Sequence, residues 1–328
     1  MALTLSFACG RYDRTEPLQT GEIRPDGIDL ANLVLSPADT FWRLSQGADF
    51  DVSEMSLSGF IMRVARGDTS YVGLPVFTSR VFRHSGIVLR NEVQGAADLV
   101  GARVAVPEYH MTAVLFMRGL LGDEFGLKPS DITWVQAGQY TPGRIEREEL
   151  HLPDGITVEV DRDNTVDGLL ASGAVQGALS PYTSRLLDQP DGPIRRLYPQ
   201  PRVAEMDYYT RTGIYPIMHL IVVRRSTYEQ HPWIITSLLD AFTRAKDLCL
   251  ERINGIGGHP PVALPFFLHH LEEARQTFGS DLWPYGLEPN RLTLQTACRY
   301  SFEQGLSARL VEPEELFAPG SLRPAYRD

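Results

Sequence analysis

The chain has 328 residues, a formal net charge of -10 at pH 7, 43% hydrophobic residues and 22% charged residues. These proportions are those of a globular protein, and the length is enough for two lobes around a sizeable core. The acidic balance argues against a nucleic-acid partner, because phosphate binding needs a basic surface. A small anionic ligand responds to local charge and is not excluded.

The three cysteines, Cys9, Cys249 and Cys298, are far apart and odd in number. They therefore indicate neither a metal site nor a disulfide framework. No apolar run is long enough to span a membrane. Only eight residues precede Cys9 in LSFACG, which is too few for a signal peptide. We expect a cytoplasmic protein without membrane association, unless a leader has been removed.

Short apolar strands followed by a polar turn and a helix start recur along the chain. The predicted strands cover residues 3–8, 50–52, 102–106 and 175–179. This alternation predicts an α/β fold with mixed, largely parallel sheets, whose ligands bind at the carboxyl ends of the strands. After the last of these strands, Ser180 and Pro181 are typical of the cap and first turn of a helix.

Two points along the chain indicate a change of lobe. LVGARVAVPE near residue 100 opens a new strand–helix series, and RTGIYPIMHLIVVRRS returns to a strand after a Pro- and Arg-rich stretch. We therefore expect a first lobe of residues 1–100 and 213–328, and an inserted second lobe of residues 101–212. A ligand would bind in the cleft between the two lobes.

The stretch FTSRVFRHSGIVL gathers Arg80, Arg83 and His84 within five residues, just before an apolar strand. Two buried guanidinium groups need anionic partners, and carboxylates suit their geometry best. A lone histidine in such a place is more often a core residue than a catalyst. The neighbouring arginines make His84 a candidate for the site.

Two predicted helix starts carry further polar side chains. SEMSLS contains Glu54, Ser56 and Ser58, and PEYHMT contains Tyr109, His110 and Thr112. Free backbone N–H groups and the helix dipole favour a carboxylate at such a position, although a plain helix cap accounts for the same residues. Two helix starts that face each other across the cleft would suit a dicarboxylate.

Three other segments supply single candidates. Arg14 lies in GRYDRT, which is also typical of a solvated turn. His219 begins the return strand in YPIMHLIVV, and Glu288 lies in the turn-rich segment WPYGLEPNR. The sequence contains no metal signature, phosphate loop, dinucleotide fingerprint or nucleophile elbow. The residues alone therefore indicate a two-lobed protein that binds a small anionic ligand.

Six motifs in chain order resemble the 4,5-dihydroxyphthalate decarboxylase family: CGRYDRT, FDVSEMSLS, PVFTSRVFRHS, PEYHMTA, RTGIYPIMH and WPYGLEPNR. The resemblance extends from residue 5 to about residue 318. Members of that family resemble type II periplasmic binding proteins in fold. They convert 4,5-dihydroxyphthalate to protocatechuate and CO2. On chemical grounds we expect protonation of the ring carbon, followed by loss of its carboxylate as CO2.

The resemblance implies a small aromatic dicarboxylate as substrate, and the roles of the individual candidates are our hypothesis. His84 is the first choice for the proton donor and His219 the second, and Glu54 or Glu288 would accept the phenol proton. The predicted carboxylate-binding and pocket residues are Arg14, Arg80, Arg83, Ser56, Ser58, Tyr109 and Thr112. This chemistry needs no organic cofactor, and no ligand cluster supports a divalent metal.

Two other functions stay open. The same fold usually captures ligands without changing them, so a non-catalytic aromatic-carboxylate binding protein could use every residue named above. A decarboxylase of a related hydroxylated aromatic acid would also fit, because no motif shows which ring substituents the site recognises. The sequence leaves homo-oligomer formation open as well.

Overall fold

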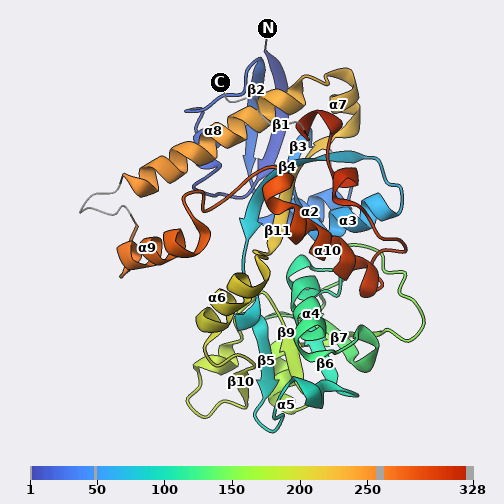
Figure 1. The fold of residues 1–328 in the computed structure, drawn as a ribbon. Coiled ribbons are helices and arrows are strands. Elements are labelled where there is room, and N and C mark those ends of the chain that lie inside the picture. The colour runs from blue at the N-terminus through green and yellow to red at the C-terminus, as the bar shows by residue number, and fades with distance from the viewer. Residues whose placement is uncertain (1, 48–49, 256–261, 323–328) are drawn as a thin grey trace.

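The computed structural model describes residues 2–47, 50–255 and 262–322, and it has two lobes, each built around one sheet (Figure 1). Strand β1 and the long helix α8 lie in one lobe, while α4 and α5 lie in the other. The α/β fold with mixed sheets that the alternation of strands and helices predicts is confirmed.

The first sheet has the strand order β2-β1-β3-β11-β4. Its strands are β1 (Leu3–Cys9), β2 (Ile28–Val34), β3 (Val52–Ser56), β4 (Tyr71–Arg80) and β11 (Ile217–Arg224). β1 runs parallel to β2 and β3, whereas β11 is antiparallel to β3 and β4. The return strand β11 therefore completes the sheet that the start of the chain begins.

The second sheet has the strand order β10-β5-β9-β6-β7-β8. Its strands are β5 (Ile87–Arg90), β6 (Arg103–Val106), β7 (Thr133–Gly138), β8 (Thr157–Thr165), β9 (Gly177–Leu179) and β10 (Ile194–Arg196). β6 runs parallel to β7 and β9, and β5 is antiparallel to β9 and β10.

The chain crosses to the second sheet earlier than residue 101, the boundary expected from the sequence. β5 pairs with β9 through Ile87 and Leu179, so the crossover lies between β4 and β5. The apolar run that forms β5 continues the pattern of β4, and its partner strand is far along the chain. Composition therefore could not show to which sheet it belongs.

Helices cover both sheets and fill the space between the lobes. They are α1 (Glu16–Gln19), α2 (Pro37–Ser45), α3 (Leu57–Ala65), α4 (Thr112–Phe125), α5 (Val166–Ser172), α6 (Pro201–Thr212), α7 (Arg225–Gln230), α8 (Ile234–Asn254), α9 (Phe267–Phe278) and α10 (Arg291–Glu303). α8 packs an apolar face on the first sheet, where Phe242 meets Phe7 edge to face. In the described parts of the chain, none of the helices has the length and apolar character of a membrane span.

The interior between the lobes is continuous. α4 is buried on every side from Thr112 to Leu121, and α10 contacts both α3 of the first lobe and α4 of the second. Tyr300 of α10 packs edge to face on Phe116, with ring centroids 5.8 Å apart. These contacts hold the starts of α3 and α4 next to each other.

The helix expected to begin at Pro181 does not form. Ser180 donates its hydroxyl to Gln139 Oε1 at 2.7 Å and accepts the N–H of Tyr182, so its side chain does not cap a helix. The next helical turn is a short 3-10 turn, Arg185–Asp188, which Ser184 caps. The segment before it, which forms neither helix nor strand, places Pro181 and Tyr182 at the cavity between the lobes.

Candidate functional site

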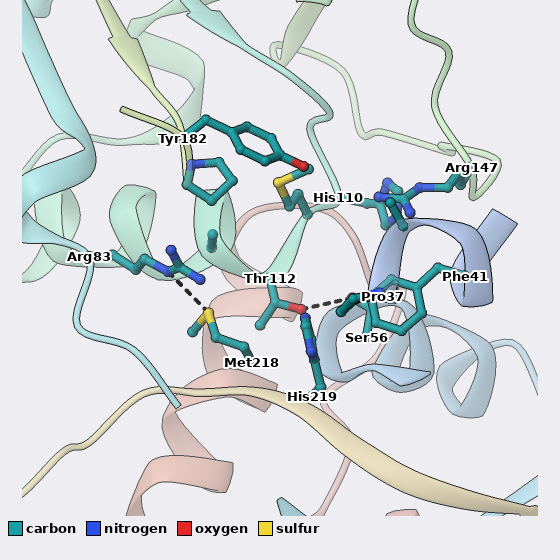
Figure 2. A pocket seen from close by; sticks show the side chains of 14 residues that line it. Pro37, Phe41, Ser56, Arg83, His110, Thr112, Arg147, Tyr182, Met218 and His219 are labelled. Carbon is teal, nitrogen blue, oxygen red and sulfur yellow. Dashed lines mark hydrogen bonds between the residues drawn. The ribbon is translucent and has the colours of Figure 1, made fainter. Parts of the chain in front are cut away.

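A cavity of about 150 Å³ lies between the lobes, where the ends of strands and the starts of helices converge (Figure 2). Its basic lining residues are Arg83, His110, Arg147 and His219. None of the described residues that line it is Asp or Glu. A protein with ten more acidic than basic residues thus presents basic side chains to this cavity.

A histidine and a buried carboxylate form a pair at the wall of the cavity. Glu54 on β3 and His219 on β11 lie on neighbouring antiparallel strands, and His219 Nδ1 is 2.8 Å from Glu54 Oε1. The Nε2 atom of His219 has no hydrogen-bond partner within the described residues. Glu54 therefore fixes the ring so that Nδ1 faces the carboxylate and Nε2 is free to exchange a proton.

The Glu54 carboxylate is completely buried but well supplied with donors. Burial alone raises its pKa, but the hydrogen bond and charge of His219 and the donors Tyr12 and Gly10 outweigh this effect. The pKa of Glu54 is lowered to about 2, so the group is ionised at neutral pH. Tyr12 and Thr78 donate to Oε1 at 2.7 and 2.9 Å, and the N–H of Gly10 donates to Oε2 at 2.9 Å.

The two helix starts predicted to face each other do meet. Ser56 directly precedes α3, Thr112 begins α4, and their hydroxyl oxygens are 2.8 Å apart. Both residues line the cavity. Ser58 lies behind them, where its N–H donates to Thr112 Oγ1 at 3.0 Å and its hydroxyl donates to the carbonyl of His110.

Arg83 is the arginine of the FTSRVFRHS segment that reaches the cavity. Its Nε is 3.2 Å from the sulfur of Met218, and it forms no ion pair with any residue that the structure describes (Figure 2). Burial lowers the pKa of Arg83 to about 10, so it still carries its charge at neutral pH. An unpaired guanidinium beside a cavity is suited to bind a carboxylate.

Arg14 and Arg80, the other two predicted carboxylate ligands, lie outside the cavity lining. Arg80 is buried and donates to the carbonyl of Pro284 at 2.9 Å and to the Asn290 side chain, which fastens the 284–290 turn to β4. Arg14 donates to the carbonyl of Thr78, and its guanidinium carbon is 4.1 Å from the ring centre of Trp283. Both cations therefore bind protein groups of the first lobe.

His84, the first choice for the proton donor, is also outside the cavity lining. It is only 2% exposed, and neither ring nitrogen has a hydrogen-bond partner in the described part of the chain. The rings of Tyr198 and Tyr208 pack against it edge to face at 4.9 and 5.2 Å. Burial lowers the pKa of His84 to about 4. These contacts describe a neutral histidine in an aromatic core.

Two further candidates point elsewhere. Glu288 is an exposed residue whose carboxylate is 2.7 Å from Arg291 at the start of α10. Tyr109 is fully buried, donates its hydroxyl to the carbonyl of Gln304 at 3.1 Å, and has Arg118 stacked over its ring. Neither side chain lines the cavity.

The site contains a basic cluster to whose residues the sequence analysis assigns no role. Arg147 comes from the long connection between β7 and β8, and His110 precedes α4. Arg147 binds Glu108 with two hydrogen bonds of 2.9 Å, and His110 Nδ1 is 2.6 Å from Glu146 Oε1. His110 stands in the PEYHMT motif and could have been chosen from it. Nothing in the pattern around Arg147 indicates a site.

No group of three or more His, Cys, Asp or Glu side chains within the described ranges is arranged to hold a metal ion. The titratable residues of the cavity instead form separate pairs, His219 with Glu54 and His110 with Glu146.

Comparison with known proteins places the chain among enzymes by sequence and among binding proteins by fold. No protein-family model matches it. It is 38% identical to a 4,5-dihydroxyphthalate decarboxylase of Comamonas testosteroni over 323 residues, 98% of each chain. It is 40% identical to a 4,5-dihydroxyphthalate decarboxylase of Pseudomonas putida over 210 residues, 63% of this chain and 81% of that protein.

Solved structures of periplasmic binding proteins share the fold. The aliphatic sulphonate binding protein SsuA of Escherichia coli matches with a TM-score of 0.53 and 14% identity, over 97% of this chain and 98% of that chain. A sulfonate-binding SsuA of Methylobacillus flagellatus matches with a TM-score of 0.58 and 15% identity, over 98% and 93%. The predicted type II periplasmic-binding-protein fold is therefore confirmed.

Proposed function

Because the chain belongs to the 4,5-dihydroxyphthalate decarboxylase family, we propose that it is a carboxy-lyase that converts 4,5-dihydroxyphthalate to protocatechuate and CO2. The observation that carries this proposal is the pairing of His219 with the buried, ionised Glu54 at the wall of a cavity that also holds an unpaired Arg83. Such a site combines a proton-transfer group with a carboxylate-binding group.

The cavity suits a single aromatic ring. A cavity of about 150 Å³ is large enough for benzene. Its walls include the side chains of Phe41, Pro181, Tyr182 and Met218, which offer apolar surface to a ring. Arg83 would then bind a carboxylate of the substrate at one side of the cavity.

Loss of CO2 from an aromatic ring needs a proton on the carbon that bears the carboxylate. Otherwise the departing electron pair would remain in the ring plane, where the ring does not stabilise it. In 4,5-dihydroxyphthalate this carbon is para to a hydroxyl, which pushes electron density onto it when its proton is removed. After protonation the C–C bond breaks, its electrons return to the ring, and aromaticity is restored. The site must therefore supply an acid at the carbon and an acceptor at the phenol.

His219 is the residue proposed to protonate the ring carbon, through Nε2. Glu54 acts as a positioning residue, since its oxygens are occupied by His219, Tyr12, Thr78 and Gly10. This arrangement also argues against Glu54 as the acceptor of the phenol proton. The route needs no organic cofactor, and a divalent metal is tested directly by the assay below.

The test is incubation of metal-stripped protein with 4,5-dihydroxyphthalate, with CO2 and protocatechuate followed by chromatography. We expect turnover in the wild type and a loss of about 100-fold or more in His219→Gln, the usual size of a general-acid contribution. Phthalate, which lacks the hydroxyls, should still bind to His219→Gln. A near-normal rate in this variant would refute the proton-donor role, and binding without turnover in the wild type would favour a binding protein.

A further inference from the structure

The cavity contains a second histidine–carboxylate pair. His110 Nδ1 is 2.6 Å from Glu146 Oε1, as His219 Nδ1 is 2.8 Å from Glu54 Oε1. Glu146 also accepts the backbone N–H groups of Tyr109 and His110 at 3.0 and 2.6 Å. The carboxylate therefore fixes both the ring of His110 and the segment that carries it, and it leaves Nε2 without a hydrogen-bond partner within the described residues.

The two pairs come from different lobes and reach the same cavity. Glu54 and His219 lie in the first sheet, whereas His110 and Glu146 follow β6 and β7 of the second sheet. Figure 2 shows Arg83 on one side of the cavity, His110 and Arg147 on the other, and His219 between them. An aromatic acid whose carboxylate meets Arg83 would extend its opposite edge toward His110 and Arg147.

The carboxylates around His110 make it a stronger base than a free histidine, because they stabilise the imidazolium that forms when it takes up a proton. Burial lowers the pKa of His110, but the carboxylates of Glu146 and Glu108 outweigh burial and raise it above its usual value. Arg147 lies beside it and shares Glu108 with Arg144, whose Nε donates to Glu108 Oε1 at 2.6 Å. Arg144 alone can neutralise Glu108, so part of the Arg147 charge is available to a ligand.

We propose that His110 accepts the proton of the substrate hydroxyl para to the departing carboxylate, and that Arg147 stabilises the resulting phenolate. This inference rests on the proposed function and supplies the phenol acceptor that neither Glu54 nor Glu288 can provide. Glu146 acts as a positioning residue for His110.

The proposed steps conserve both protons and electrons. The O–H proton moves to His110 Nε2, and the phenolate pushes electron density to the para carbon, which takes a proton from His219 Nε2. The C–C bond then breaks, CO2 leaves, and the bonding pair returns to the ring as phenolate. His110 gives its proton back to this oxygen, and solvent restores the proton that His219 lost.

The test uses 4-hydroxybenzoate, whose hydroxyl is para to its carboxylate, and benzoate, which has no hydroxyl. Phenolates absorb at longer wavelength than phenols, so the ultraviolet spectrum of bound 4-hydroxybenzoate reports its ionisation. We expect the phenolate band in the wild type at neutral pH and its loss in His110→Gln. Benzoate affinity should change by less than about threefold, and kcat on 4,5-dihydroxyphthalate should fall about 100-fold or more.

His151→Gln is the matched control, because His151 lies in the connection that carries Glu146 but is an exposed residue paired with Glu149. It should keep both the phenolate band and kcat. If His110→Gln does not fold, Arg147→Gln provides a second test of the proposal. It leaves the His110–Glu146 pair in place and should weaken 4-hydroxybenzoate binding about 10- to 100-fold more than benzoate binding.

The outcomes separate this inference from the proposed function. A neutral phenol in the wild-type complex, or a phenolate band and kcat unchanged in His110→Gln, would overturn the inference even if the wild type releases CO2. A His110-dependent phenolate band in a protein that releases no CO2 would uphold the acceptor and refute the lyase.

Discussion

Replacing Glu54 by Gln tests whether a fully buried, ionised carboxylate organises the site. The pKa of Glu54 is lowered from 4.5 to about 2 in the folded chain. This difference corresponds to about 3 kcal/mol of folding free energy at neutral pH. Because the folded-state pKa is depressed, the contribution is present above pH 4.5 and is lost as the pH falls toward 2. About 2 kcal/mol should be lost by pH 3.

The assay is urea unfolding of the wild type and Glu54→Gln at pH 7, 5 and 3. The difference in free energy of unfolding between the two proteins should be about 3 kcal/mol or more at pH 7 and should shrink by about 2 kcal/mol between pH 5 and 3. Other carboxylates titrate in both proteins and cancel in the difference. Glu288→Gln makes the same substitution at an exposed residue and serves as the control. Its difference in unfolding free energy from the wild type should not shrink in this way between pH 5 and 3. A difference that stays constant with pH would mean that folding does not lower the pKa of Glu54.

Three further substitutions test the placement of the remaining candidates. His84→Phe should keep kcat/KM within about threefold. The variant should also lose less unfolding free energy than the wild type as the pH falls from 6.5 toward 4. The pKa of His84 is lowered to about 4, so its stabilising contribution is present above pH 6.5 and is lost as the pH falls toward 4. Arg80→Met should lower the unfolding free energy by about 2 kcal/mol, because the hydrogen bonds to Pro284 and Asn290 are lost. The ratio of phthalate to benzoate affinity should not change. Arg83→Gln should weaken benzoate binding about 10- to 100-fold in calorimetry with an unchanged melting temperature; equal binding would refute its role.

The fold and part of the site could be predicted from the sequence because they depend on local pattern. Strand–turn–helix alternation predicts the α/β architecture, and the polar pattern at helix starts singles out Ser56 and Thr112, which line the cavity. Glu54 and His219 were chosen separately. Their contact depends on β11 returning between β3 and β4, which no local pattern encodes.

The choice between His84 and His219 shows where local reasoning ends. Arg80, Arg83 and His84 are close in sequence, but only Arg83 faces the cavity. Arg80 turns toward a segment about two hundred residues away, and His84 packs on rings from the 198–208 region. Which neighbour faces the ligand is decided by these distant partners, so residue type and spacing could not separate them.

The division of the site between the lobes explains how a binding-protein fold can support catalysis. A ligand bound by Arg83 alone would only be captured, since a cation on a carboxylate does not move a proton. In the proposed mechanism the two histidine–carboxylate pairs would add proton transfer, and each pair is held by one lobe. The connection that carries Glu146 and Arg147 is tied to α3 of the first lobe by Glu148, whose carboxylate is 2.9 Å from Arg63. This ion pair fixes the acceptor side of the cavity relative to the His219 side, so both proton-transfer groups can act on one ring in the same bound state.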